Sequence, residues 1–279
     1  MFEYTKNNHF DYYKRKHGSC SSHQSWRDEC KNVARELYDK HGNDLIIMLS
    51  GGVDSEVVLL SFLAAGIKPR VGMLRFENHI NSHDLSFGFK RCADNELIPE
   101  IIDVNVASFF KKQLIPFSER TKISSPQINL HAYFFDTVDG IPIIGAGENF
   151  LVEKNGIVYD QEDEYLMRYV RYFIEKDREC IPTFFQYTPE IMLSFLQRKS
   201  VYDWVKNPKG ATTHKFKIDW IQEEFDVPLR SKLTGFECIQ RKDTMYRNQL
   251  RSHNYGDDIK YHTEFFKYIE SLREDYGKT

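Results

Sequence analysis

The residues of this chain best suited to chemistry lie in one short turn, Ser50-Gly-Gly-Val-Asp-Ser55. Glycines lack a Cβ, so they let backbone N–H groups converge on an anion, and the two serines add hydroxyl donors. If a helix begins at the end of the turn, its N-terminus adds a partial positive charge. These residue types predict a loop that binds phosphate.

A strand and a helix must hold this turn in place. Residues 45–49 are five consecutive apolar residues, too few for a helix and suited to a strand that is buried on both faces. Residues 57–63 are mostly apolar and supply one face of a helix that begins near Asp54. The sequence therefore predicts a strand, a glycine turn and a helix in succession. The same pattern also fits an ordinary strand, turn and helix without a ligand.

The turn is not a Walker loop, because Gly-x-x-x-x-Gly-Lys-Ser/Thr occurs nowhere in the chain. It instead resembles the PP-loop of the N-type ATP pyrophosphatases, and the chain is closest in pattern to the synthase domain of asparagine synthetases. The resemblance covers residues 25–150, and the last third of the chain more loosely. Enzymes of this superfamily cleave ATP between the α- and β-phosphates and transfer AMP to a carboxylate or carbonyl oxygen. A nitrogen or sulfur nucleophile then displaces the AMP.

The resemblance implies roles for the turn and for the second strand. It implies ATP and Mg²⁺ as cofactors, with Asp54 as a catalytic residue and a magnesium ligand. Backbone groups at the end of the second strand would hold adenine. The residues implied in nucleotide binding are Ser50, Gly51, Gly52, Val53 and Ser55 in the turn, and Leu74, Arg75 and Phe76 in the strand.

A second glycine turn, Gly145-Ala-Gly-Glu148, follows a later apolar run. It resembles the Gly-x-Gly-x-Asp-Glu turn of asparagine synthetases, which implies that Gly145 and Gly147 contact the nucleotide and that Glu148 binds magnesium together with Asp54. The chain departs from that pattern at Asn149, which stands at the second acidic position. A tight turn at the end of a strand, with an exposed Glu148, is the alternative interpretation.

Two cationic segments near the C-terminus suit the stabilisation of phosphate charge. Arg230-Ser-Lys-Leu-Thr-Gly-Phe236 resembles the Arg-x-Lys and Gly-Phe segment of asparagine synthetases, which implies that Lys232, with Arg230, acts as a catalytic cation at the α-phosphate. Residues 206–217 are rich in lysine and fit either a lid over a triphosphate or a solvated loop.

Apolar runs and helical patterns alternate along the first half of the chain. This alternation predicts an α/β fold with a parallel, doubly wound sheet, in which the carboxyl ends of the strands open on one crevice. Asn81 or Ser82 is expected to cap one of the helices. Strands are predicted at residues 45–49, 70–76, 98–104 and 141–144, and helices at residues 25–41, 82–95 and 105–113, near Asp54 and after Ser125.

The C-terminal part is predicted to be mainly helical. Asn155-Gly156 predicts a β-hairpin, and the acidic run of residues 160–164 is expected to open a helix. Further helices are predicted after Thr188 and at residues 218–225, 237–250 and 261–276. The expected division is an N-terminal extension with a leading helix (1–43), an ATP-binding core (44–150) and a hairpin with a helical portion (151–279).

Composition limits the partners. A net charge of -3 creates no field that would draw the whole chain onto nucleic acid or an anionic membrane. The N-terminus lacks a signal-peptide pattern, no apolar run is long enough to span a bilayer, and the five cysteines form no Cys-x-x-Cys pair. We therefore expect a cytoplasmic protein, for which a homodimer is an open possibility.

The sequence favours a ligase that joins a small acceptor to an amine or to ammonia. Phe2 stands where the glutamine-hydrolysing domain of asparagine synthetases has its catalytic cysteine, so nitrogen would arrive as ammonia, as an amine or from a separate amidotransferase subunit. Two alternatives remain open. One is modification of a nucleobase or of tRNA by thiolation or deazaguanine synthesis, and the other is a nucleotide-binding module without turnover.

Overall fold

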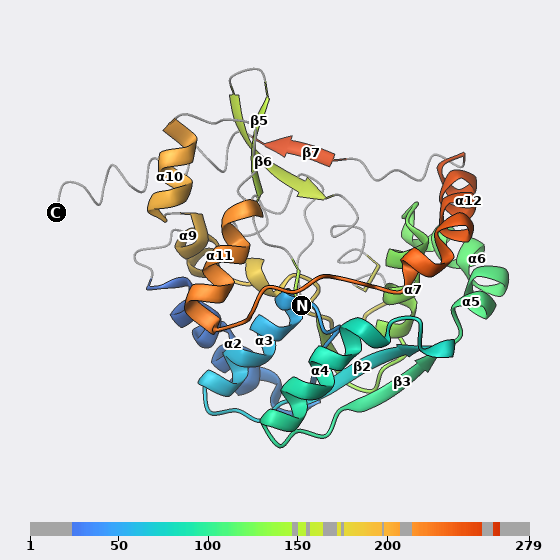
Figure 1. Ribbon diagram of the computed structural model, residues 1–279, viewed down its shortest axis with the longest axis horizontal. Helices are drawn as coiled ribbons and strands as arrows, with labels where there is room; N and C mark the ends of the chain where they lie inside the picture. Colours follow the sequence, from blue (N-terminus) through green and yellow to red (C-terminus); the bar gives the residue numbers. More distant parts are fainter. Residues whose placement is uncertain are drawn as a thin grey trace.

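The computed structural model describes residues 24–146, 150–154, 157–163, 172–173, 176–196, 198–206, 214–252 and 259–262. Four strands form a parallel sheet in the order β3-β2-β1-β4, of which β2 and β3 are labelled in Figure 1. Ile47 of β1 is in register with Val71 on one side and Ile143 on the other. The topology therefore reverses beside the first strand. The strands of this sheet are β1 (Leu45–Met48), β2 (Arg70–Phe76), β3 (Glu100–Val104) and β4 (Ile141–Ile143).

Helices occupy most of the connections between strands. The α-helices among the described residues are α2 (Trp26–His41), α3 (Val53–Ala64), α4 (Ser82–Asp94), α5 (Val106–Lys112), α6 (Leu114–Thr121), α7 (Pro126–Phe135), α9 (Pro189–Leu196), α10 (Lys199–Lys206), α11 (His214–Phe225) and α12 (Gln240–Arg251). Short 3₁₀ turns in the same residues are η1 (Gly42–Asp44), η2 (Glu77–His79), η3 (Phe184–Gln186) and η4 (Phe236–Ile239). Among the described helices, none has the length and apolar character needed to cross a membrane.

Both faces of the sheet are covered, which confirms the predicted doubly wound α/β class. Successive side chains of a strand point to opposite faces. Leu45 and Ile47 accordingly belong to the core that contains residues of α2, α3 and α4. Ile46 and Met48 belong to a second core with residues of α5, α6 and α7. A strand buried on both sides explains why residues 45–49 are all apolar.

The outer edge of β4 is covered by the chain just after Cys180. Ile181 forms a parallel bridge with Ile143. Its N–H donates to the Pro142 carbonyl at 2.8 Å, and its own carbonyl accepts from the Ile144 N–H at 2.9 Å. The covered edge leaves fewer unpaired backbone groups exposed. It also brings residues 181–186 alongside the turn that follows β4.

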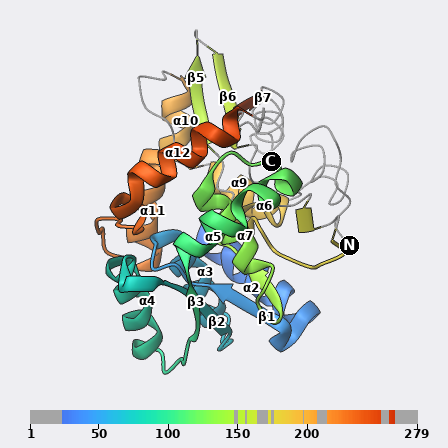
Figure 2. The ribbon, with the colours of Figure 1, turned by 90° about the vertical axis from the view of Figure 1, so that its right-hand side faces the viewer.

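A second, antiparallel sheet contains β5 (Phe150–Lys154), β6 (Ile157–Asp163) and β7 (Ile259–His262) in that order. Figures 1 and 2 show it at the opposite end of the molecule from β2 and β3. The pairing of β5 with β6 confirms the predicted hairpin. Asn155-Gly156, which would form its tip, lies outside the described residues.

Two predictions for this region were wrong at residues that the structure describes. The acidic residues Asp160, Glu162 and Asp163 belong to β6, so the predicted helix does not begin among them; residues 172–173 are helical, and residues 164–171 lie outside the described part of the chain. Tyr261, expected to begin a helix over residues 261–276, belongs to β7 and pairs with Gln161, while residues 263–276 lie outside the described part of the chain. The partner strand of Tyr261 lies about 100 residues earlier in the sequence, and the acidic residues pair with β7 and, at Asp160, also with the nearby β5. In both cases strand pairing overrides the local preference, because strand stability depends on the neighbouring strand.

Other helix predictions were confirmed. Ile191 N–H donates to the Thr188 hydroxyl at 3.3 Å, which is the expected cap of α9. The helix predicted at residues 105–113 is α5, with Asn105 as its N-cap. Helix α6 follows directly, and Pro116 lies in its first turn, where proline is tolerated. Residues 218–225 and 240–250 are helical, within α11 and α12.

Candidate functional site

The Ser50–Ser55 turn lies where the sheet reverses direction. It follows β1, which has β2 on one side and β4 on the other. In open α/β sheets this point, at the carboxyl ends of the strands, is where ligands bind. Gly51 has a φ of +83°, and a Cβ built on it would lie 1.8 Å from the backbone oxygen of Asp84. Glycine is therefore required here, and the turn rests directly on the first turn of α4.

The two serines of the turn are bonded to each other. Their hydroxyl oxygens are 3.1 Å apart, and the Ser55 hydroxyl also donates to the Gly52 carbonyl at 3.0 Å. Gly52 N–H donates to the Ser50 hydroxyl at 3.2 Å. Gly52 is also the N-cap of α3, and it provides no side chain to accept from the first N–H groups of that helix. The turn and the helix start together form an anion-binding geometry.

The turn after β4 meets the first turn of α3 through Gly145. A Cβ on Gly145 would lie 2.8 Å from both the Asp54 carbonyl carbon and the Ser55 nitrogen. This close approach brings the two glycine turns singled out in the sequence into backbone contact. Gly147, Glu148 and Asn149 lie outside the described residues, so their implied roles stay predictions.

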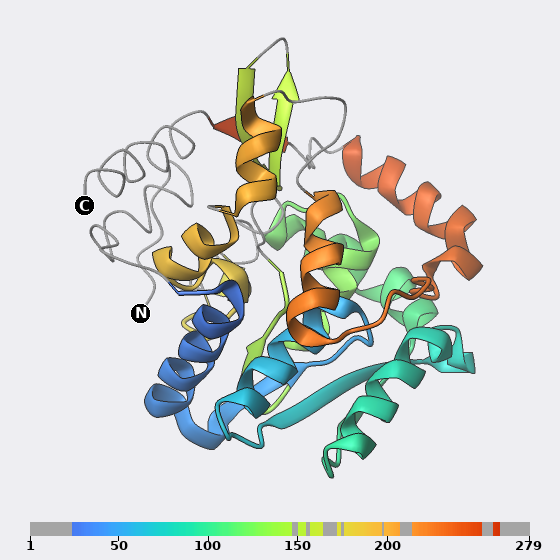
Figure 3. The same cartoon turned by 60° about the vertical axis from the view of Figure 1, so that its left-hand side comes forward.

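A lysine that the sequence did not assign to the site lies beside Asp54. Lys217 belongs to α11, which packs on α3 (Figure 3). Its side chain is 2% exposed, and its Nζ lies 2.8 Å from Asp54 Oδ1. The distance is that of an ion pair, although this buried oxygen is not placed to accept a hydrogen bond. Lys217 therefore brings a positive charge to the side of the turn.

Neither interpretation of residues 206–217, a lid or a solvated loop, fits the last residues of that segment. Lys217 is buried within a helix, and residues 207–213 lie outside the described part of the chain. Trp220, Ile221 and Phe225 of α11 are buried in the same core as α2 and α3. Their helical spacing was the signal in the sequence that could have placed Lys217 on a packed helix.

Residues 230–236 return to the region of the turn, as the resemblance implied. Leu233 N–H donates to the Asp84 carboxylate at 2.7 Å. Gly235 has a φ of +88°, and a Cβ there would lie 2.8 Å from the Ile80 backbone oxygen. Asp84 thus contacts the glycine turn through its backbone and this segment through its side chain. Lys232 itself is exposed.

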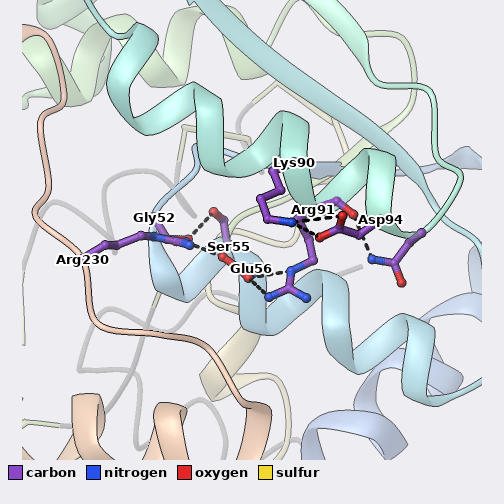
Figure 4. A network of polar contacts seen from close by, with 8 residues as sticks. Gly52, Ser55, Glu56, Lys90, Arg91, Asp94 and Arg230 are labelled. Atoms are coloured by element: carbon purple, nitrogen blue, oxygen red, sulfur yellow. Dashed lines mark hydrogen bonds and ion pairs between the residues drawn. The ribbon is translucent and has the colours of Figure 1, made fainter.

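The guanidinium of Arg230 is engaged with α3. It binds the carboxylate of Glu56 and lies 4.4 Å from the ring centre of Phe87. Arg91 of α4 donates to the other oxygen of Glu56 at 2.6 Å. Figure 4 shows the two arginines reaching Glu56 from different elements. These contacts tie the segment to α3 and α4, while the catalytic roles of Arg230 and Lys232 stay predictions.

The end of β2 is occupied by the side chain of Asn81. Its amide donates to the Leu74 carbonyl at 2.8 Å and accepts from the Phe76 N–H at 3.0 Å. Asn81 therefore stands at the N-cap position of α4, as expected, but its side chain makes no cap hydrogen bond, because its amide satisfies strand groups instead. Arg75 pairs with Asp103 of β3 at 2.6 Å. The proposed adenine-binding groups lie next to this amide, and their role stays a prediction.

His131 of α7 lies against the same strand end. Its ring stacks on Phe76 and Phe135, with ring centres 6.3 and 5.9 Å apart. Burial, together with the Lys232 ammonium, lowers the pKa of His131 from 6.5 to about 4. The imidazole is therefore neutral at pH 7.

This shift predicts a loss of stability in mild acid. Below pH 6.5 the unfolded chain binds a proton at His131 that the folded chain does not bind until about pH 4. Between pH 7 and pH 5 the parent should lose about 2 kcal/mol more free energy of unfolding than the His131→Phe variant. Urea unfolding at the two pH values measures this. Equal losses in both proteins would rule out a depressed His131 pKa.

The described residues could bind magnesium only together with the phosphate groups of a ligand. They contain no group of three histidine, cysteine or acidic side chains that could hold a metal ion. They do provide Asp54, whose buried Oδ1 accepts no hydrogen bond. Magnesium in nucleotide sites is commonly held by one or two carboxylates and the phosphates themselves. The residues present fit that arrangement.

No known protein family and no curated protein matches the sequence of this chain. Solved structures that it resembles include the NMN synthetase from Francisella tularensis, with a TM-score of 0.34, 11% identity, and 82% of this chain and 94% of that chain covered. Another is the NH3-dependent NAD synthetase from Campylobacter jejuni subsp. jejuni NCTC 11168 in complex with the nitrate ion. Its TM-score is 0.33 and its identity 15%, with 83% and 96% of the two chains covered. Likenesses this distant carry no argument about function.

Proposed function

We propose that this chain is a PP-loop ATP pyrophosphatase that adenylates a substrate carboxylate or carbonyl oxygen and then joins it to an amine or ammonia. The observation that supports this most is the composition of the reversal point of the sheet. There the glycine turn after β1, the Gly145 backbone and the buried Lys217 ammonium surround the first turn of α3. Backbone donors and a cation beside one helix N-terminus suit a polyphosphate.

In the proposed reaction the turn holds the outer phosphates. Ser50, Gly51, Gly52 and Ser55 supply the donors, and Asp54, with Glu148, would hold magnesium, which when bound offsets charge on the phosphates. The substrate oxygen attacks the α-phosphorus, an oxygen–phosphorus bond forms, and the bond to the β-phosphate oxygen breaks. Lys232 and Arg230 are the proposed cations for the charge that develops on the α-phosphate and on the leaving pyrophosphate.

The second step needs no nucleophilic side chain. The nitrogen of an amine or of ammonia attacks the adenylated carbon, a carbon–nitrogen bond forms, and AMP leaves with the electrons of the carbon–oxygen bond. A separate amidotransferase subunit is a proposed source of the ammonia. Holding the outer phosphates while the α-phosphorus reacts is the contribution that we assign to the turn.

Release of pyrophosphate and formation of AMP test the proposal. We expect both from MgATP in the presence of a carboxylate and an amine drawn from a panel that also contains tRNA. Asp54→Asn and Ser50→Ala should each lower the rate at least about 100-fold, as expected when a donor or charge at a developing anion is lost. Asp94→Asn is the matched control, since it removes only a surface pair with Lys90.

Each other outcome favours a different function. Pyrophosphate release that requires tRNA would favour modification of a nucleobase, and ATP binding without release would favour a nucleotide-binding module. Unchanged turnover in Asp54→Asn and Ser50→Ala would remove the turn from the mechanism. A parent that does not bind ATP would overturn the proposal altogether.

A further inference from the structure

Lys217 is among the most deeply buried charged side chains in the described chain. It is 2% exposed, whereas its partner Asp54 is 28% exposed and borders the glycine turn. Lysine is almost never this buried unless it is paired. The carboxylate of Asp54 therefore lies between a buried ammonium and the position proposed for the phosphates.

Stability alone does not account for this pair. Two charges removed from water lose hydration, and well-packed apolar residues of similar volume are often as stabilising as a buried ion pair. Helix α11 already docks through Trp220, Ile221 and Phe225, which are buried in the core with residues of α3. The groups around Lys217 provide a different explanation for a buried lysine at this position.

The pairing at Asp54 is incomplete. Oδ1 is buried and accepts no hydrogen bond, although the Lys217 nitrogen is 2.8 Å away. The first turn of α3, which carries Asp54, has no side-chain cap from Gly52. The backbone of Gly145 approaches the same turn at the Asp54 carbonyl and the Ser55 nitrogen.

We propose that Lys217 is a polyphosphate-binding residue that pairs with Asp54 until a polyphosphate binds. When the polyphosphate enters the turn, the ammonium passes from the carboxylate to a phosphate oxygen. Asp54 can then bind a divalent cation. This inference rests on the proposed function, and it names the cation that meets the phosphates. Both side chains stay paired through the exchange, so neither buried charge is left uncompensated.

The exchange makes binding depend on the charge of Asp54. Without a divalent cation, a polyphosphate that takes the Lys217 ammonium leaves the Asp54 carboxylate unpaired beside another anion. Metal-free polyphosphate should therefore bind the parent weakly. If residue 54 is neutral, the ammonium no longer has this competitor, and metal-free binding should improve.

The test is calorimetric binding of inorganic pyrophosphate to the full chain without divalent cations. The proteins are the parent, Asp54→Asn, Lys217→Met and the double variant. We expect Asp54→Asn to bind about 10-fold more tightly and Lys217→Met about 10-fold more weakly than the parent, as for the gain or loss of one hydrogen bond to a charged group. In the Lys217→Met background, Asp54→Asn should bring little gain.

Lys68→Met is the control, since it removes an exposed lysine that pairs with Glu96, and it should leave binding unchanged. An equal gain from Asp54→Asn with and without Lys217 would overturn the inference. If Lys217→Met does not fold, as judged by thermal unfolding, Asp54→Asn still decides: weaker or unchanged binding contradicts the exchange.

The two proposals fail in different ways. If the parent binds MgATP but the effect of Asp54→Asn is independent of Lys217, only the exchange is wrong. If neither pyrophosphate nor MgATP binds to any of the proteins, the proposed function is wrong, and the exchange with it.

Discussion

Gly51→Ala is expected to lower the free energy of unfolding by roughly 2–5 kcal/mol, the sum of a left-handed backbone penalty and an overpacking penalty. The φ of Gly51 is +83°, which an L-residue adopts at a cost. The new Cβ would also lie 1.8 Å from the Asp84 oxygen and 2.4 Å from its carbon. These are backbone atoms, so either the turn or α4 must move. Nucleotide binding should be lost with the shape of the turn.

Gly66→Ala separates the two penalties. Gly66 has a φ of +79°, and nothing lies within 4 Å of a Cβ built on it. This variant should lose only about 1 kcal/mol, the left-handed penalty alone. Urea unfolding of both variants gives the comparison. If the two losses were equal, the contact between the turn and α4 would not be close in solution.

The parts of the fold that the sequence predicted are those with local causes. A buried strand of five apolar residues, a glycine turn and an apolar helix face identify β1 and α3 within 20 residues. Proline and threonine at the start of α9 identify that helix in the same way. The parallel order of the sheet follows from the alternation of strands and helices, because crossovers are right-handed and short.

The parts that it missed depend on partners far apart in the chain. Lys217 meets Asp54 across more than 160 residues, and β7 completes a sheet whose other strands lie about 100 residues earlier. Asn81 looked like a helix cap because an amide before a helix usually is one. It instead bonds the backbone of Leu74 and Phe76. A local sequence pattern shows that a polar residue stands before a helix, but it does not show which of several nearby backbone groups the side chain will bond.

Glu56→Gln should have the second large effect. The side chain of Glu56 is 3% exposed and lies between Arg91 and Arg230, whose side chains are 24% and 10% exposed. Glutamine keeps the size of the side chain but leaves two guanidinium groups facing each other without an anion. Removing one member of a buried charge group typically costs about 3–5 kcal/mol, and we expect about 3 here because the arginines are partly hydrated.

Lys90→Ala is the control for Glu56→Gln. Lys90 precedes Arg91, a partner of Glu56, on α4 (Figure 4), and it pairs with Asp94 at an exposed position. It should change stability by no more than about 0.5 kcal/mol. Chemical denaturation distinguishes the two variants. If Glu56→Gln were as mild as Lys90→Ala, solvent would already screen the charges at Glu56.

The Glu56→Gln substitution should also affect residues 230–236, which are distant from Glu56 in the sequence. Arg230 and Leu233 both attach residues 230–236 to the rest of the molecule, the first through Glu56 and the second through Asp84. Without the first attachment the segment opens more often, so hydrogen exchange of the Leu233 amide should speed up in Glu56→Gln by more than the global loss of stability accounts for. Asp84 also touches Gly51. Faster exchange confined to residues 230–236 would therefore show that Glu56 positions the segment that carries Lys232 beside the turn. Exchange that speeds up uniformly across the chain would show that Glu56 acts on global stability alone.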